Sequence, residues 1–133
     1  MKYTGPYELN KKDGDNGWDL RATKDVVIRP QETVTIDTGV SFEFGLDVFA
    51  LVVPRSGLSS KGILCSVGLV DTSYRGQIGV NLTNTSKDTY RVNKDDRIGQ
   101  LVFYREIKVY PCKVDKIDSD TERGTKGFGS SGR

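Results

Sequence analysis

The sequence predicts an all-β fold: a sandwich, a jelly roll or a barrel. Short apolar or alternating runs recur along the chain, and turn-forming residues separate them. Strands spaced about 8–12 residues apart are typical of sandwiches, jelly rolls and barrels. A chain of 133 residues suffices for one domain with one modest core.

The predicted elements follow from these runs and their boundaries. The expected strands are Val26–Ile28, Thr33–Ile36, Val40–Phe44, Val48–Val53, Ile78–Leu82, Thr89–Val92, Ile98–Tyr104 and Lys108–Val114. Turn signals lie at 29–32, 37–39 and 93–96. The one segment predicted as a short helix is Ser56–Lys61.

The C-terminal segment differs in composition from the rest. Residues 115–133 are polar, and residues 124–133 contain four glycines and two serines, a composition typical of a disordered tail. Phe128, between Gly127 and Gly129, favours a lid instead, because glycines permit close backbone approach and the ring can stack on a ligand. We therefore divide the chain into a barrel, 1–114, and a C-terminal arm of the same domain, 115–133, with a glycine-rich lid motif.

Composition narrows the class of protein. The net charge is +2, without the basic stripe of a nucleic-acid binder. No apolar run approaches the roughly 18–20 residues of a membrane span, and the N-terminus lacks a signal-peptide core. Cys65 and Cys112 are far apart in the sequence, which is typical of reduced thiols in a cytoplasmic protein. The expected compartment is the cytoplasm of a bacterial cell or, for a phage-encoded protein, the cytoplasm of its host. With 35% hydrophobic residues, an oligomer is expected.

The chain contains no histidine. Serine–histidine and cysteine–histidine triads, histidine-ligated zinc and the commonest general base are therefore excluded. Any acid–base chemistry must come from carboxylates, lysine, tyrosine or cysteine.

Three segments carry groups suited to a nucleotide. Arg55, Ser56 and Gly57 follow a strand and offer donors for phosphate oxygens, although a surface arginine beside a helix-capping serine explains them equally. The segment 68–79 reads as a hairpin with an open backbone for a planar base and with Asp71 to orient a water, or as a plain exposed hairpin. The segment 123–132 offers cations, hydroxyls and amides for a polyphosphate, but it is not a P-loop.

Five segments in order resemble the motifs of the trimeric dUTPases: Asn16–Arg21, Pro54–Leu58, Gly68–Gly76, Asp96–Leu101 and Arg123–Gly132. The resemblance covers nearly the whole chain. It implies a distorted β-barrel or jelly roll that assembles as a homotrimer. The implied activity is hydrolysis of dUTP to dUMP and pyrophosphate with Mg²⁺, which supplies dUMP and keeps uracil out of DNA. It also implies that the tail closes over a neighbouring subunit's site.

The resemblance assigns a role to each matching position. Asp71 matches the carboxylate that activates water for attack on the α-phosphorus, and Tyr74 matches the ring that excludes a 2′-hydroxyl. The positions expected to bind substrate are Arg55, Ser56, Gly57 and Gln100 for phosphates, Gly68, Leu69, Val70 and Gly79 for uracil, and Arg123, Phe128, Gly129, Ser130 and Ser131 on the tail. Asp19 matches a carboxylate that reaches Mg²⁺ through water, and no direct protein ligand is expected. Cys65 departs from the pattern, since some relatives carry asparagine there.

Two alternatives remain open. A dCTP deaminase shares the fold but uses a glutamate on the strand after the hairpin, where this chain carries Asn81. A non-catalytic homologue would sense nucleotides or bind a regulatory protein, and such a partner can coexist with catalysis. Intact Asp71, Tyr74 and Phe128 favour the enzyme.

Overall fold

Short antiparallel strands build most of the body of the protein, as predicted. The computed structural model describes residues 1–127. Within them the only helix is α1 (Ser56–Ser59). The strands are β1 (Lys2–Thr4), β2 (Trp18–Arg21), β3 (Val26–Ile28), β4 (Thr33–Asp37), β5 (Ser41–Glu43), β6 (Val48–Val53), β7 (Ile63–Cys65), β8 (Gly68–Val70), β9 (Gly79–Asn84), β10 (Tyr90–Val92) and β11 (Arg97–Arg105).

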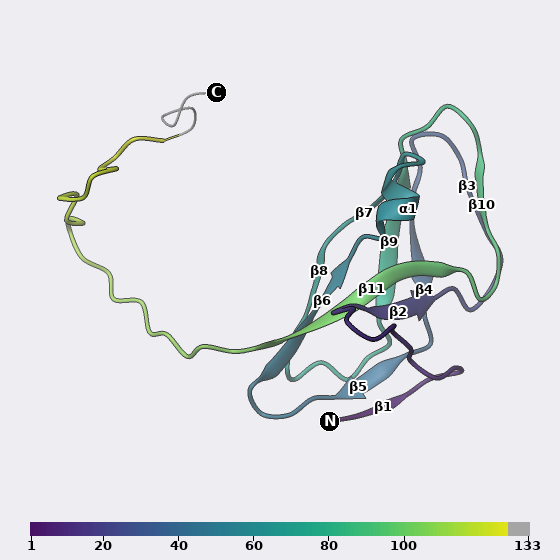
Figure 1. The fold of residues 1–133 in the computed structure, drawn as a ribbon, viewed down its shortest axis with the longest axis horizontal. Helices are drawn as coiled ribbons and strands as arrows, with labels where there is room; N and C mark the ends of the chain where they lie inside the picture. The colour runs from purple at the N-terminus through teal and green to yellow at the C-terminus, as the bar shows by residue number, and fades with distance from the viewer. Residues whose placement is uncertain (128–133) are drawn as a thin grey trace.

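The strands form two larger sheets and two small ribbons (Figure 1). One sheet has the order β2, β11, β6, β8, and the other has the order β4, β9, β7. The ribbons pair β1 with β5 and β10 with β3. In the first sheet the long strand β11 lies between β2 and β6, so segments from three distant parts of the sequence become neighbours.

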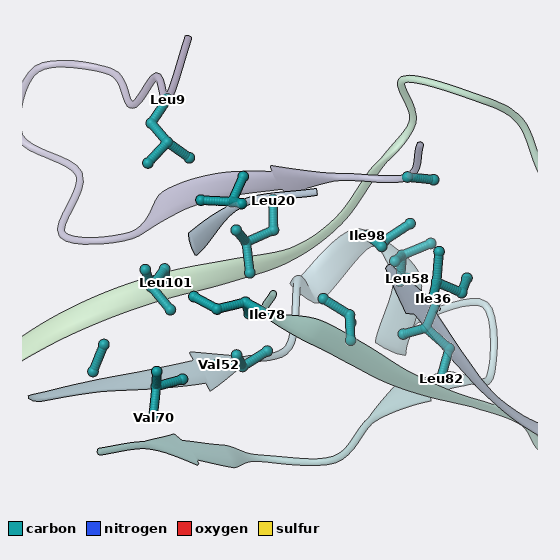
Figure 2. Packing of buried hydrophobic residues seen from close by; sticks show 14 of the residues in the cluster. Leu9, Leu20, Ile36, Val52, Leu58, Val70, Ile78, Leu82, Ile98 and Leu101 are labelled. Carbon is teal, nitrogen blue, oxygen red and sulfur yellow. The ribbon is translucent and has the colours of Figure 1, made fainter. Parts of the chain in front are cut away.

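The core lies between the sheets. Alternate residues of β9, Val80 and Leu82, are fully buried, as are Ile36 of β4 and Leu101 of β11. Figure 2 shows Ile36, Leu82 and Leu101 in one cluster of buried aliphatic side chains with Val52, Val70 and Ile78. This period of two is what strands with one buried face require.

The predicted strand Lys108–Val114 is wrong: residues 106–127 contain no strand. An isolated strand leaves its backbone groups without partners, and here no second strand lies beside it. The predictions also missed β1, β2 and β7, which are too short to show a clear alternation. The other expected strands are present, with shifts of one or two residues at their ends.

After β11 the chain leaves the body as an extended segment, of which the C-terminal arm is the later part (Figure 1). Apolar side chains on it are exposed, with Ile107 83% and Tyr110 89% accessible. Within residues 1–127, no other segment covers these apolar side chains. No helix in residues 1–127 has the length and apolar character that a membrane crossing requires.

Candidate active site

A cavity of about 180 Å³ opens beside the segment that the sequence predicted as a hairpin. We call it the loop cavity. The residues that line it are Val52, Gly68, Leu69, Val70, Asp71, Tyr74, Gln77, Ile78 and Gly79. The proposed base Asp71, the proposed sugar contact Tyr74 and the proposed uracil contacts Gly68, Leu69, Val70 and Gly79 therefore line one cavity.

The loop cavity exists because β8 and β9 belong to different sheets. The prediction of a hairpin is corrected here: β8 pairs with β6, while β9 pairs with β4 and β7. Since β8 is at the edge of its sheet, one row of its backbone donors and acceptors has no partner strand within residues 1–127. Such groups can bond to the edge of a planar ligand in the way that a peptide adds to a sheet edge.

The floor of the loop cavity is apolar and rigid. Val52, Val70 and Ile78 are almost fully buried in the core that Figure 2 shows. The rim is polar, since Asp71 and Gln77 are exposed. An apolar floor with a few polar groups at the rim is the usual form of a small-molecule site.

Local hydrogen bonds fix the loop that carries Asp71 and Tyr74. The amide of Tyr74 donates to the Asp71 carbonyl at 3.0 Å, which closes a turn. The Thr72 hydroxyl donates to the Val48 carbonyl at 2.8 Å and ties this turn to the start of β6. The Tyr74 hydroxyl donates to the Gln77 carbonyl at 2.9 Å, so the ring is held across the loop.

Gly76 is a site residue whose role the sequence did not reveal. A Cβ at this position would lie 2.6 Å from Cζ of Tyr74 and closer still to its hydroxyl. The glycine therefore allows the ring to fold back over the loop. The sequence signal that could have revealed this role was the position of the glycine two residues after Tyr74.

Gly76→Ala is expected to displace the Tyr74 ring and to weaken discrimination against a 2′-hydroxyl about tenfold, which is within the roughly 100-fold that a 1 Å misplacement can cost. Rates with deoxyuridine and uridine triphosphates, compared in the variant and the parent, test this. Gly45→Ala is the control for the added methyl group, since a Cβ at Gly45 meets only Val48 Cγ2, at 3.8 Å, and this glycine lines neither cavity. An unchanged preference in Gly76→Ala would contradict the role assigned to the glycine.

A second cluster gathers three of the predicted motifs on one sheet. Asp19 of β2 lies between two guanidinium groups: Oδ1 is 3.3 Å from Arg55 Nε, and Oδ2 is 3.3 Å from Arg97 Nη1. The Asp19 and Arg55 side chains are only 18% and 24% exposed. The contact of Arg55 Nε is an ion pair without hydrogen-bond geometry, whereas its Nη1 donates to the Arg97 carbonyl at 3.2 Å.

Gln100 joins the same cluster from β11, where it pairs with Asp19 on one side and Val53 on the other. Its side chain lies against Gly17, since a Cβ there would come within 3.0 Å of Gln100 Cβ and Cδ. The glycine of the first motif therefore makes room for the glutamine of the fourth.

A basic cavity of about 410 Å³ adjoins this cluster. Its walls include Arg55, Gly57, Lys61, Arg91 and Arg97, a set of donors that suits an anion with several oxygens. Arg97 was part of a predicted motif but was not predicted as a site residue. No sequence signal pointed to this role, because the position of Arg97 depends on the register that pairs it with Arg21 of β2.

Other predicted residues stand apart from these cavities. Ser56 is exposed and is the first residue of α1. With four residues, this helix is too short for its N-terminus to form an anion-binding site. Arg123 lies on the arm, lines neither cavity, and its Nε donates to the Lys126 carbonyl at 3.2 Å. Phe128, Gly129, Ser130 and Ser131 lie outside the described residues. Neither of the two cavities is lined by both Asp71 and Asp19, and among residues 1–127 no residue lines both the loop cavity and the basic cavity.

Two further observations bear on the chemistry. Within residues 1–127, no three aspartate, glutamate, cysteine or histidine side chains gather closely enough to hold a metal ion. Burial raises the pKa of the Cys65 thiol, so this residue is a neutral thiol at pH 7, and its Sγ donates to the Ser66 carbonyl at 3.5 Å.

The chain resembles known proteins over nearly its whole length. The family model described as dUTPase matches residues 6–132. The chain is 43% identical over 119 residues to the deoxyuridine 5'-triphosphate nucleotidohydrolase of cowpox virus, covering 90% of this chain and 80% of the relative. The same identity and length hold for the monkeypox virus protein of that name, of which 78% is covered.

Solved structures give the same result. A dUTPase of Staphylococcus bacteriophage 80alpha, solved with dUpNHpp, superposes with a TM-score of 0.90 at 27% identity, over 99% of this chain and 98% of that one. A mutant dUTPase of phage phi11 of S. aureus, described with a structural Mg(II) ion, superposes with a TM-score of 0.80 at 24% identity, over 89% and 98%. The match of fold, length and motif order places the chain in one family: it belongs to the dUTPases.

Proposed function

We propose that the protein hydrolyses dUTP to dUMP and pyrophosphate. The observation that carries the proposal is the loop cavity, where a carboxylate, an aromatic ring and the unpaired edge of β8 meet over an apolar floor. Membership of the dUTPase family supports the same activity.

Uracil enters the loop cavity between β8 and the start of β9. Backbone groups of Gly68, Leu69, Val70 and Gly79 read its edge, because their donor–acceptor order is fixed and differs from what cytosine needs. Tyr74 packs against the deoxyribose and leaves no room for a 2′-hydroxyl. The narrowness of the cavity excludes a 5-methyl group.

Asp71 acts as the general base. Its carboxylate is at the end of β8 and at the rim of the cavity, where it accepts a proton from the attacking water. The water adds to the α-phosphorus, the bond to the bridging oxygen breaks, and pyrophosphate leaves. A positioned base contributes about 10²–10⁴-fold to such a step.

Arg55, Ser56, Gly57 and Gln100 bind the phosphates. When a nucleotide arrives, its oxygens compete with Asp19 for the Arg55 guanidinium, whose Nε contact is an ion pair alone. The Asp19 oxygen released in this way can accept a hydrogen bond from a water of a metal ion. Such an outer contact fits Mg²⁺, which keeps its waters and, when bound to the triphosphate, neutralises charge on the phosphate oxygens.

The active unit in this proposal is a homotrimer in which subunits share sites. The separation of the loop cavity from the basic cavity within one chain supports sharing, as does the exposed apolar arm. The arm, residues 115–133, extends from the barrel, 1–114, to a neighbouring site, where Arg123, Phe128, Gly129, Ser130 and Ser131 cover the nucleotide. The cytoplasm remains the predicted location.

The test of the function compares the turnover of dUTP with that of dTTP, dCTP and UTP in the presence of Mg²⁺. Turnover is measured as the release of pyrophosphate. We expect dUTP alone to be hydrolysed efficiently. Ammonia release from dCTP would instead identify a deaminase. That outcome is disfavoured because Asn81 carries no acid and its Oδ1 accepts from the Thr35 hydroxyl at 2.6 Å. Purified, folded protein that leaves dUTP intact would refute the proposal.

Asp19→Asn is expected to raise KM for dUTP and to weaken the response to Mg²⁺ about tenfold, the scale seen for residues that act on a metal through another group. The amide keeps the shape but loses the charge that holds Arg55 and Arg97. Steady-state kinetics across Mg²⁺ concentrations measure the effect. Asp47→Asn is the matched control, because it removes an exposed ion pair with Arg105 at 3.1 Å on the other end of the sheet. Equal kinetics in both variants would rule out this role for Asp19.

A further inference from the structure

Arg75 has no role in the function described so far, yet it makes two of the hydrogen bonds that shape the catalytic loop. Its Nη1 donates to the Thr72 carbonyl at 2.7 Å and to the Tyr74 carbonyl at 2.9 Å. One nitrogen therefore draws together two carbonyls that flank Ser73. Neither carbonyl has another hydrogen-bond donor among residues 1–127.

Two further hydrogen bonds fix the loop on either side of the pair of carbonyls that Arg75 binds. The Thr72 hydroxyl fixes one side to β6, and the Tyr74 hydroxyl fixes the other side to the Gln77 carbonyl. Ser73 to Gln77 are exposed, so little apolar packing holds this stretch of backbone. Where packing is sparse, hydrogen bonds decide the conformation of a loop.

Arg75 is placed to hold this conformation without touching the ligand. Its side chain forms part of the wall of a separate cavity, with Tyr3 and Phe42 of the β1–β5 ribbon. It does not line the loop cavity. The guanidinium thus braces the loop from outside the cavity that Asp71 and Tyr74 line.

We infer that Arg75 is a positioning residue that sets the sugar selectivity of the site, by fixing the Tyr74 backbone relative to Asp71. The inference rests on the proposed function, because it concerns how the same site distinguishes deoxyribose from ribose. A planar guanidinium suits the task, since its donors have a fixed geometry that an ammonium lacks.

The test compares Arg75→Ala with the parent protein on dUTP and UTP. We expect kcat/KM for dUTP to fall about tenfold and the preference for dUTP over UTP to fall about fivefold, since a misplacement near 1 Å can cost up to roughly 100-fold. Guanidinium ion, added well below denaturing concentrations, should restore part of the preference. Arg75→Lys should be intermediate, and it provides the same comparison if the alanine variant does not fold.

Arg29→Ala is the matched control, because Arg29 is an exposed arginine on a turn and pairs with Glu32 at 4.0 Å. Thermal melting verifies that each variant is folded. A dUTP-to-UTP preference equal to that of the parent in a folded Arg75 variant overturns the inference, whatever its absolute rate. Failure of the parent itself to hydrolyse dUTP would instead defeat the proposed function, so the two failures are distinguishable.

Discussion

Asp71→Asn is expected to bind dUTP with nearly the parent affinity and to hydrolyse it about 10²–10⁴ times more slowly. The amide has the size of the carboxylate but cannot take a proton from water. Because the turn at this position is held by the backbone bond from Tyr74 to the Asp71 carbonyl, the substitution leaves the loop in place. Calorimetric titration with a non-hydrolysable dUTP analogue and pyrophosphate release measure the two quantities separately.

Asp88→Asn is the matched control for this substitution. Asp88 is an exposed aspartate between β9 and β10, away from both cavities. Its variant should bind and turn over dUTP as the parent does. Unchanged turnover in Asp71→Asn would remove Asp71 from the mechanism and, with it, the reason for placing the reaction in the loop cavity.

Deletion of residues 124–133 is expected to lower kcat/KM for dUTP by about 100-fold or more, the scale of losing a preorganised donor to a reacting group. The barrel should melt at the parent temperature. The residues just before the deletion are exposed, and within residues 1–127 their hydrogen bonds are confined to the arm. Activity and thermal melting of the shortened chain test both statements. A shortened chain with full activity would exclude the tail from the site.

Mixed trimers extend this test to the sharing of sites. An Asp71→Asn subunit keeps its tail, and a shortened subunit keeps its Asp71, so a site that draws on two subunits can contain both. We expect activity to reappear when the two inactive proteins are refolded together and isolated as heterotrimers. Verified heterotrimers without activity would contradict shared sites.

Sequence reasoning found the strands whose apolar pattern is long enough to be distinctive. Val48–Val53 was predicted with its observed bounds, and the short helix was predicted to begin at Ser56, where it does begin. Gly68, Asp71, Tyr74 and Gly79 were assigned to one site by their match to the dUTPase motifs, and in the structure all four line one cavity.

Pairing between distant strands was harder to predict. Nothing in the segment 68–79 distinguishes a paired hairpin from two strands that enter different sheets. The contact of Asp19 with Arg97 depends on the register of β2 against β11, which includes a shift between Arg97 and Gly99. Lys108–Val114 has the composition of a strand, but a strand forms only where a partner offers its backbone.

The division of β8 and β9 between two sheets has a consequence for the stability of the protein. Within residues 1–127, β8 ends one sheet and β9 belongs to another, so no ladder of backbone hydrogen bonds joins these two strands. If the base binds as proposed, it supplies cross-links that the polypeptide lacks there. We then expect resistance of this boundary to opening to rise with substrate occupancy, by mass action, and to decline each time product departs.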